Sequence, residues 1–186
     1  MLDVGQANEL KLAFRRADWS NDDIKRLCEG DVLADVRRVL RRQALIAAIE
    51  HIIDCDKDPY LPDGWKVEDH LKGDKLIWDA SKVNLYLSDH QKNYKTIRGR
   101  QLLAELAGKP VLNANVLDYL LANKYIIPEE WKGKYVFFWG TVYSPLSGTL
   151  CVRYLFWSDR ERSWAWNQRW LGTTCRDDEP AALLVS

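Results

Sequence analysis

A short acidic run contains the residues of this 186-residue sequence that are most suited to binding a metal ion. Asp54, Asp56 and Asp58 alternate like the first carboxylates of a calcium-binding loop, so they could converge on one hard cation. The rest of that pattern is missing, because Pro59 stands where the sharp turn needs glycine and Trp65 where a bidentate glutamate belongs. We therefore expect a solvated acidic loop and no metal site.

Signatures of catalysis and of zinc binding are absent from the sequence. His51, His70 and His90 lack ligand spacing, and there is no nucleophile elbow or phosphate-cradling glycine loop. The cysteines are far apart and form no CxxC pair, so we expect four reduced thiols: Cys28, Cys55, Cys151 and Cys175. The sequence predicts a non-enzymatic protein without a cofactor. A site assembled from distant residues would leave no such signature, so an enzyme stays an alternative.

A basic helix face is the candidate for contact with nucleic acid. Guanidinium groups suit phosphate oxygens, and a row of them can follow a backbone. The row consists of Arg37, Arg38, Arg41 and Arg42. Lysine plus arginine and aspartate plus glutamate both total 27, so the net charge is zero and provides no global field for a polyanion. A solvated helix face is the simpler interpretation, and nucleic-acid association through these arginines is the alternative function.

Polar residues near the carboxyl terminus are the candidates for ligand recognition. Alternate residues of a strand point to opposite faces, so we expect Trp164, Trp166, Trp170 and Leu171 to pack inward. The residues between and after them would then form a mixed polar surface on an aromatic scaffold, as adaptable recognition surfaces do. The predicted ligand-binding residues are Ala165, Asn167, Gln168, Arg169, Thr173, Thr174, Arg176, Asp177 and Asp178. For the tryptophans themselves, an ordinary core strand is the commoner role.

Helical periodicity dominates the first third of the chain. It predicts a helix over 6–17, a second from the Ser20–Asp23 capping box to Gly30, and a third from Asp31. The apolar stretch 45–53 predicts a buried continuation or a further helix. We expect a helical region over 1–57 and an α+β region over 58–186, either separate or joined in one compact domain.

Two-residue periodicity dominates the last third. Aromatic and β-branched residues fill 135–143, 150–157 and 163–171, which predicts an antiparallel meander, and six of the nine tryptophans follow residue 130. Before it we expect a strand over 83–87, a helix over 101–107 and another capped by Asn115. The predicted fold class is α+β, with N-terminal helices followed by a tryptophan-rich antiparallel sheet. No apolar stretch is long enough for a membrane span, so we expect a soluble cytoplasmic protein without a membrane partner.

Seven segments along the chain resemble a family of short proteins from uncultured bacteria with reduced genomes. They cover residues 7–16, 29–34, 62–67, 111–118, 127–132, 137–141 and 180–183. No activity is established for that family, so the resemblance implies no catalytic residues.

The tail has a more specific likeness. Its frame of Trp164, Trp166, Trp170, Leu171 and Pro180-Ala181-Ala182 is similar to the variable region of target proteins of diversity-generating retroelements. Those targets bind ligands through a C-type-lectin-like domain with the variable side chains on one face. The resemblance implies such a domain at the C-terminus, and a binding module whose partner is an unknown protein or other macromolecule.

Overall fold

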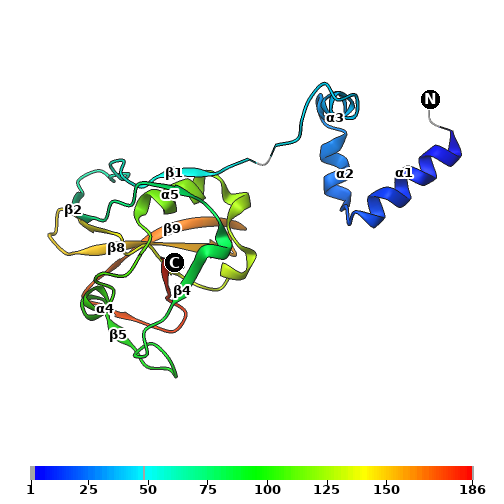
Figure 1. Ribbon diagram of the computed structural model, residues 1–186. Coiled ribbons are helices and arrows are strands. Elements are labelled where there is room, and N and C mark those ends of the chain that lie inside the picture. Colours follow the sequence, from blue (N-terminus) through cyan, green and yellow to red (C-terminus); the bar gives the residue numbers. More distant parts are fainter. Residues whose placement is uncertain (1–2, 48, 186) are drawn as a thin grey trace. The chain divides into compact units, whose positions relative to one another are not determined.

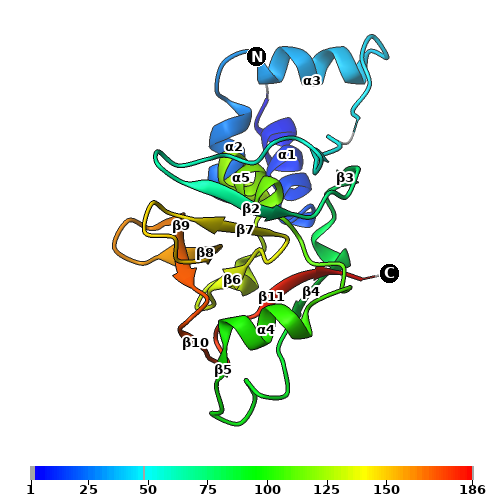
Figure 2. The same ribbon diagram turned by 90° about the vertical axis from the view of Figure 1, so that its left-hand side faces the viewer.

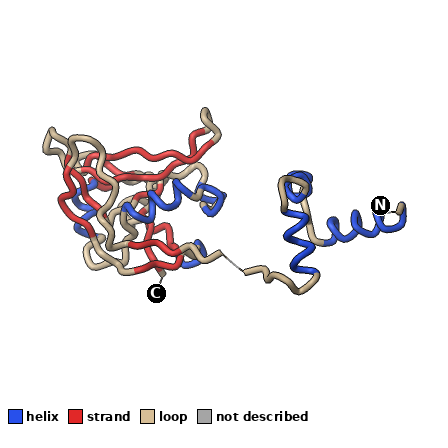
Figure 3. The backbone as a smooth tube through the Cα atoms, turned by 90° about the horizontal axis from the view of Figure 1, so that it is seen from above, coloured by secondary structure: helices blue, strands red, loops and turns tan. Residues whose placement is uncertain are grey.

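The computed structural model describes residues 3–47 and 49–185, which belong to two compact units, Met1–Ile49 and Glu50–Ser186 (Figure 1). The described strands all lie in the second unit, whereas the first contains helices (Figure 3). Residues 50–57, expected with the helices, are part of the second unit, because strand β1 (Ile52–Asp54) pairs with β3 (Lys75–Ile77). None of the helices in the described ranges is long and apolar enough to cross a membrane.

The first unit consists of α1 (Val4–Arg16), α2 (Asn21–Leu27) and α3 (Val32–Leu40). The predicted capping box begins α2: the Ser20 hydroxyl accepts from the N–H of Asp23 at 3.2 Å, and the Asp23 carboxylate accepts from the N–H of Ser20 at 2.9 Å. None of the described side chains in these helices is buried. The helix predicted over 45–53 is wrong, because Leu45 and Ile46 lie in an exposed loop.

The described part of the second unit contains two α-helices, α4 (Gly99–Glu105) and α5 (Ala114–Ala122). Its remaining strands are β2 (Lys66–His70), β4 (Val83–Tyr86), β5 (Ile97–Arg98), β6 (Val136–Phe137), β7 (Thr141–Ser144), β8 (Cys151–Ser158), β9 (Ser163–Trp170), β10 (Thr174–Cys175) and β11 (Ala181–Leu184). Short 3-10 helices span Ala80–Lys82, Lys124–Ile126 and Glu129–Trp131. This mixture of helices and sheet confirms the coarse fold class.

The main sheet has the order β2-β7-β8-β6-β11-β4, and β9 pairs with β8. All of its pairs are antiparallel except β11 with β6. The meander expected at residues 135–171 is present as β7, β8 and β9, but its first strand is divided into β6 and β7. Gly140 lies at that division, where the chain meets the start of α5: its N–H donates to the Leu112 carbonyl at 2.9 Å.

Helices cover both faces of the sheet (Figure 2). On one face α5 packs over a cluster that includes Leu155 and Trp164, and on the other α4 packs over a cluster that includes Tyr154 and Leu171. Neighbouring residues of β8 therefore enter different cores. The N-cap of α5 is Asn113 and not the predicted Asn115, because Asn113 accepts from the N–H of Asn115 at 3.2 Å.

Candidate recognition surface

Strands β8 and β9 form a hairpin that positions most of the predicted ligand-binding residues. Every residue of β9 has a partner in β8, from Ser163 opposite Ser158 to Trp170 opposite Cys151. The turn between them contains Arg162 at a φ of 48°. Because this register is continuous, strict alternation divides β9 between the two faces of the sheet.

One face of β9 carries the three tryptophans. Trp164 is only 4% exposed and packs edge-on against Trp157, with 5.5 Å between ring centroids. Trp166 is half-buried, but Trp170 is 55% exposed. The prediction that all three pack inward is therefore wrong for Trp170, which is not part of the core cluster beneath α5. Gln168 shares this face, since it also lies at an even position of the strand.

A buried arginine lies beneath these tryptophans. Arg153 on β8 is 1% exposed, and its two terminal nitrogens donate to the Asp118 carboxylate on α5 at 3.1 and 2.7 Å. The guanidinium lies 4.1 Å from the ring centroid of Trp166 and 5.4 Å from that of Tyr60. A buried guanidinium needs such pairing to offset the loss of water. The arrangement fixes α5 and the Tyr60 loop on the sheet, which is a structural role.

The other face of β9 carries Ala165, Asn167 and Arg169. Asn167 is exposed, whereas the side chain of Arg169 is 26% exposed and forms an ion pair with Glu179, whose side chain is fully buried. The second carboxylate oxygen of Glu179 accepts from the N–H of Arg176 at 2.8 Å. A buried carboxylate thus connects β9 to the loop that follows β10.

The loop after β10 contributes further predicted residues to the same place. The Arg169 guanidinium donates to the Thr174 carbonyl at 3.4 Å, and the Arg176 guanidinium donates to the Asp178 carboxylate at 2.9 Å. Asp178 accepts through its carbonyl from the N–H of Tyr135 at 2.9 Å. These contacts join the loop to one face of β9 through side chains, without backbone pairing between them.

Aromatic rings border this polar group. Tyr135 packs edge-on against Tyr154 at 5.6 Å and lies 6.1 Å from Phe156. Arg169 lies 5.9 Å from the Tyr154 ring, and burial raises the pKa of that tyrosine, an effect the nearby guanidinium opposes. We call the set Tyr135, Phe156, Asn167, Arg169, Thr174, Arg176, Asp178 and Glu179 the tail surface.

Most of the predicted ligand-binding residues lie on the tail surface or on its rim. Arg169 and Arg176 bond to Glu179, and the Thr174 carbonyl and the Asp178 carboxylate accept from these two arginines. Asn167 is exposed on the same face of β9. Ala165 is half-buried on the same face of β9, and Thr173 and Asp177 are exposed in the adjoining loops. Gln168 is the exception, because it projects from the tryptophan face.

Sequence reasoning missed Glu179, Tyr135 and Phe156. A glutamate beside two aspartates looks solvated, and its burial is explained by contacts with Arg169 and with the N–H of Arg176. The alternation of β8 could have found Phe156, because it places Phe156 and Tyr154 on one face.

The alternative site lies in the first unit. Arg37, Arg38, Arg41 and Arg42 are all exposed, and Arg38 contacts the Asp35 carboxylate at 3.5 Å. The row is interrupted because α3 ends at Leu40, and Arg42 adopts a φ of 59°. The four guanidinium groups therefore do not form one continuous helical face.

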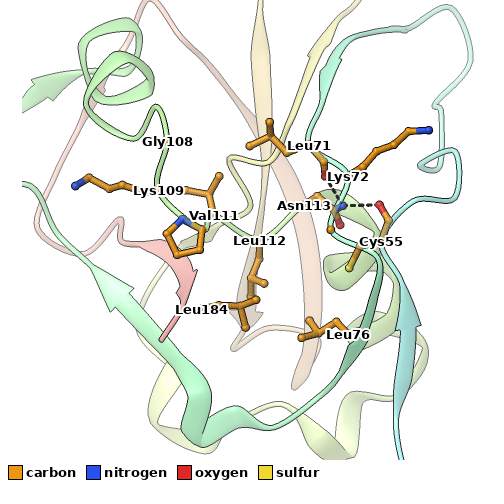
Figure 4. Close-up of a pocket in the computed structure, with 12 residues that line it drawn as sticks. Cys55, Leu71, Lys72, Leu76, Gly108, Lys109, Val111, Leu112, Asn113 and Leu184 are labelled. Atoms are coloured by element: carbon orange, nitrogen blue, oxygen red, sulfur yellow. Dashed lines mark hydrogen bonds between the residues drawn. The ribbon is translucent and has the colours of Figure 1, made fainter. Parts of the chain in front are cut away.

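A cavity of about 420 Å³ in the second unit has a different character (Figure 4). Its walls are mostly apolar, and Figure 4 shows the side chains of Lys72 and Lys109 extending away from its centre. The Asn113 amide donates both hydrogens to carbonyls, those of Cys55 and Leu71, at 2.9 and 3.0 Å. Burial raises the pKa of the Cys55 thiol to about 11, so the thiol is neutral near pH 7. The cavity offers mainly apolar contact, with Lys72 and Lys109 among the residues that line it.

The acidic run binds backbone groups of its own chain. Asp56 accepts from the N–H groups of Gly73 and Asp74 at 3.0 and 3.1 Å, and Asp54 accepts from the N–H of Asp56 at 3.0 Å. Across residues 3–47 and 49–185, no three histidine, cysteine or acidic side chains lie close enough together to hold a metal ion.

Comparison with known proteins identifies no relative. No protein-family model matches the sequence, and neither the curated proteins nor the solved structures contain a match. Functional inference for this chain therefore depends on its own side chains, and the tail surface is the group that most of the predicted residues share.

Proposed function

We propose that the chain is a non-enzymatic binding module that recognises a protein or other macromolecule through the tail surface. The observation that carries this proposal is the buried carboxylate of Glu179, which pairs with Arg169 and accepts from the N–H of Arg176, beside the exposed Asn167 on the same face of β9. Positive and negative groups are interspersed there beside half-buried aromatic rings, which suits a mixed polar partner.

Rigidity of the frame supports the proposal. The ion pair between Arg169 and buried Glu179 fixes one guanidinium, and the hairpin register fixes β9 along its whole length. A surface held in place before binding loses less conformational entropy when a partner docks. Asn167, Thr173, Arg176 and Asp177 are exposed on this frame, so they can differ without disturbing a core.

The resemblance of the tail to diversified variable regions supports a finer proposal. In it, the second unit is a C-type-lectin-like scaffold, and the exposed tail positions are those that vary between sibling proteins. The tryptophans and the Pro180-Ala181-Ala182 segment would be the constant part, because Trp164, Pro180, Ala181 and Ala182 are buried.

A display experiment tests the proposal. One library randomises the exposed tail positions Asn167, Thr173, Thr174, Arg176 and Asp177. A matched library randomises the buried positions Trp164, Leu171, Cys175 and Glu179. We expect the first library to be displayed at the wild-type level and to yield binders to streptavidin as the probe, whereas the second loses display. Loss of display from the first library, or no binder from it, would contradict the proposal.

A further inference from the structure

Strand β9 is an edge strand of the main sheet, and we call its unpaired side the open margin. In the described ranges it pairs with β8 alone, while β8 has β6 and β7 on its other side. Figure 2 shows β9 beside β8, with β6 and β7 beyond. At every second residue of an edge strand, the backbone N–H and C=O groups point away from the sheet and have no partner strand. This row of unpaired groups is a template for pairing with another strand.

The register identifies which residues of β9 have outward-facing backbone groups. The N–H of Leu171 donates to the Leu150 carbonyl at 2.9 Å, so this pair bonds inward. Hydrogen-bonded pairs recur at every second residue of an antiparallel ladder. Trp164, Trp166, Gln168 and Trp170 consequently direct their N–H and C=O groups away from β8.

Two local contacts agree with this assignment. The N–H of Gln168 donates to the side-chain oxygen of its neighbour Asn167 at 2.8 Å. The Trp170 carbonyl accepts from the N–H and hydroxyl of Thr173 at 3.0 and 2.7 Å, within the following turn. Both of these outward groups therefore bond within three residues of their own position and not to another strand.

The sheet has two other edge strands, β2 and β4, and β2 is protected in ways that β9 is not. β2 contains a register shift between Val67 and Asp69, and four of its five residues are charged or histidine. Bulges and charged side chains are the usual means by which edge strands avoid pairing with other chains. β9 is longer, has no register shift, and carries Arg169 as its single charged residue, already paired with Glu179.

Side chains beside the open margin define the partner. Trp170 is 55% exposed and Trp166 half-buried on one face, while Asn167 and Arg169 lie on the other. An added strand would place alternate side chains against these two faces. The matching sequence has apolar residues at every second position and polar residues between them.

We infer that the tail binds an extended peptide segment of its partner by strand addition along the open margin of β9. This inference rests on the proposed function, because it names the partner element that the tail surface would bind. The backbone of the peptide would bond to the outward groups of Trp166 and Gln168, and the Gln168 N–H would exchange its Asn167 acceptor for a peptide carbonyl. The apolar side chains of the peptide would pack on Trp166 and Trp170.

The probe is a phage-displayed library of random peptides of about twelve residues, long enough to span β9. It is selected on the full chain, and bound peptides are compared on Gln168→Pro and Gln168→Ala. Both variants lack the glutamine side chain, but only proline also removes the outward N–H. We expect selected peptides to show apolar residues with a two-residue period, and to lose affinity roughly tenfold on Gln168→Pro relative to Gln168→Ala.

A second measurement needs no variant of the protein, in case the proline disturbs folding. Each backbone nitrogen of a selected peptide is methylated in turn, and binding to the wild-type chain is measured. Strand addition requires the affinity to fall when the nitrogens at alternate positions are methylated, and to stay unchanged when those between them are methylated.

Three results of the peptide measurements would overturn strand addition. They are selection of no peptide, losses on methylation without a two-residue period, and equal binding to the proline and alanine variants when both fold. Dimerisation that Gln168→Pro abolishes would assign the margin to a second copy and also reject the peptide. The proposed function fails separately, when the library randomised at the exposed tail positions is not displayed or yields no binder.

Discussion

Trp164→Ala and Trp170→Ala delete the same side chain at two positions of β9. The loss in free energy of unfolding should be about twice as large for Trp164→Ala as for Trp170→Ala. Trp164 is 4% exposed within the core beneath α5, and truncation of a buried tryptophan costs roughly 3–5 kcal/mol. Trp170 is 55% exposed, so it buries less than half as much surface. Scaling by buried area gives roughly 1.5–2.5 kcal/mol for Trp170→Ala.

Urea unfolding followed by far-ultraviolet circular dichroism measures both losses, and it avoids tryptophan fluorescence, which the substitutions themselves alter. The midpoints should fall with an unchanged denaturant slope, because neither change alters the surface exposed on unfolding by much. Asn167→Ala is the matched control, since this exposed residue shares the strand and should change stability by less than about 0.5 kcal/mol. Equal losses for the two tryptophans, or a greater loss for Trp170→Ala, would refute the assignment of exposure along β9.

Four further results are expected. Cys28 should react with a thiol reagent at once, because it is exposed. Cys55, Cys151 and Cys175 should react only on unfolding, because burial raises the pKa of each thiol to about 11. Alkylation of the denatured, unreduced protein should add four groups. Since folding raises these pKa values, the associated stability is complete below about pH 8.5 and is lost as the pH rises through about 11, which pH-dependent unfolding would detect. Gly140→Ala should destabilise by about 1–3 kcal/mol, because its new Cβ would lie 2.9 Å from the Asn113 backbone, whereas Gly172→Ala, with open space around it, should melt like wild type. Nucleic-acid binding should be weak, and a sub-micromolar affinity with a steep salt dependence, lost in the Arg37→Ala, Arg41→Ala double variant, would contradict this expectation.

Local interactions explain what could be predicted from the sequence. The capping box at Ser20 and the alternation of β8 and β9 depend on residues within a few positions of one another, so they are visible in the linear order. The split of residues 135–143 into two strands was not visible. It depends on contact between Gly140 and the segment before α5, which is distant in sequence.

The candidate site shows the same division. The sequence by itself determined that neighbouring tail residues separate onto two faces, because a strand has a two-residue period. It did not determine how far each face is covered, since the cover comes from α5, the Tyr60 loop and the residues after β10. Tertiary structure therefore decided that Trp164 is buried while Trp170 is exposed. It also decided that Glu179 is buried, because only the folded chain brings the Arg169 guanidinium to its carboxylate and offsets the loss of water.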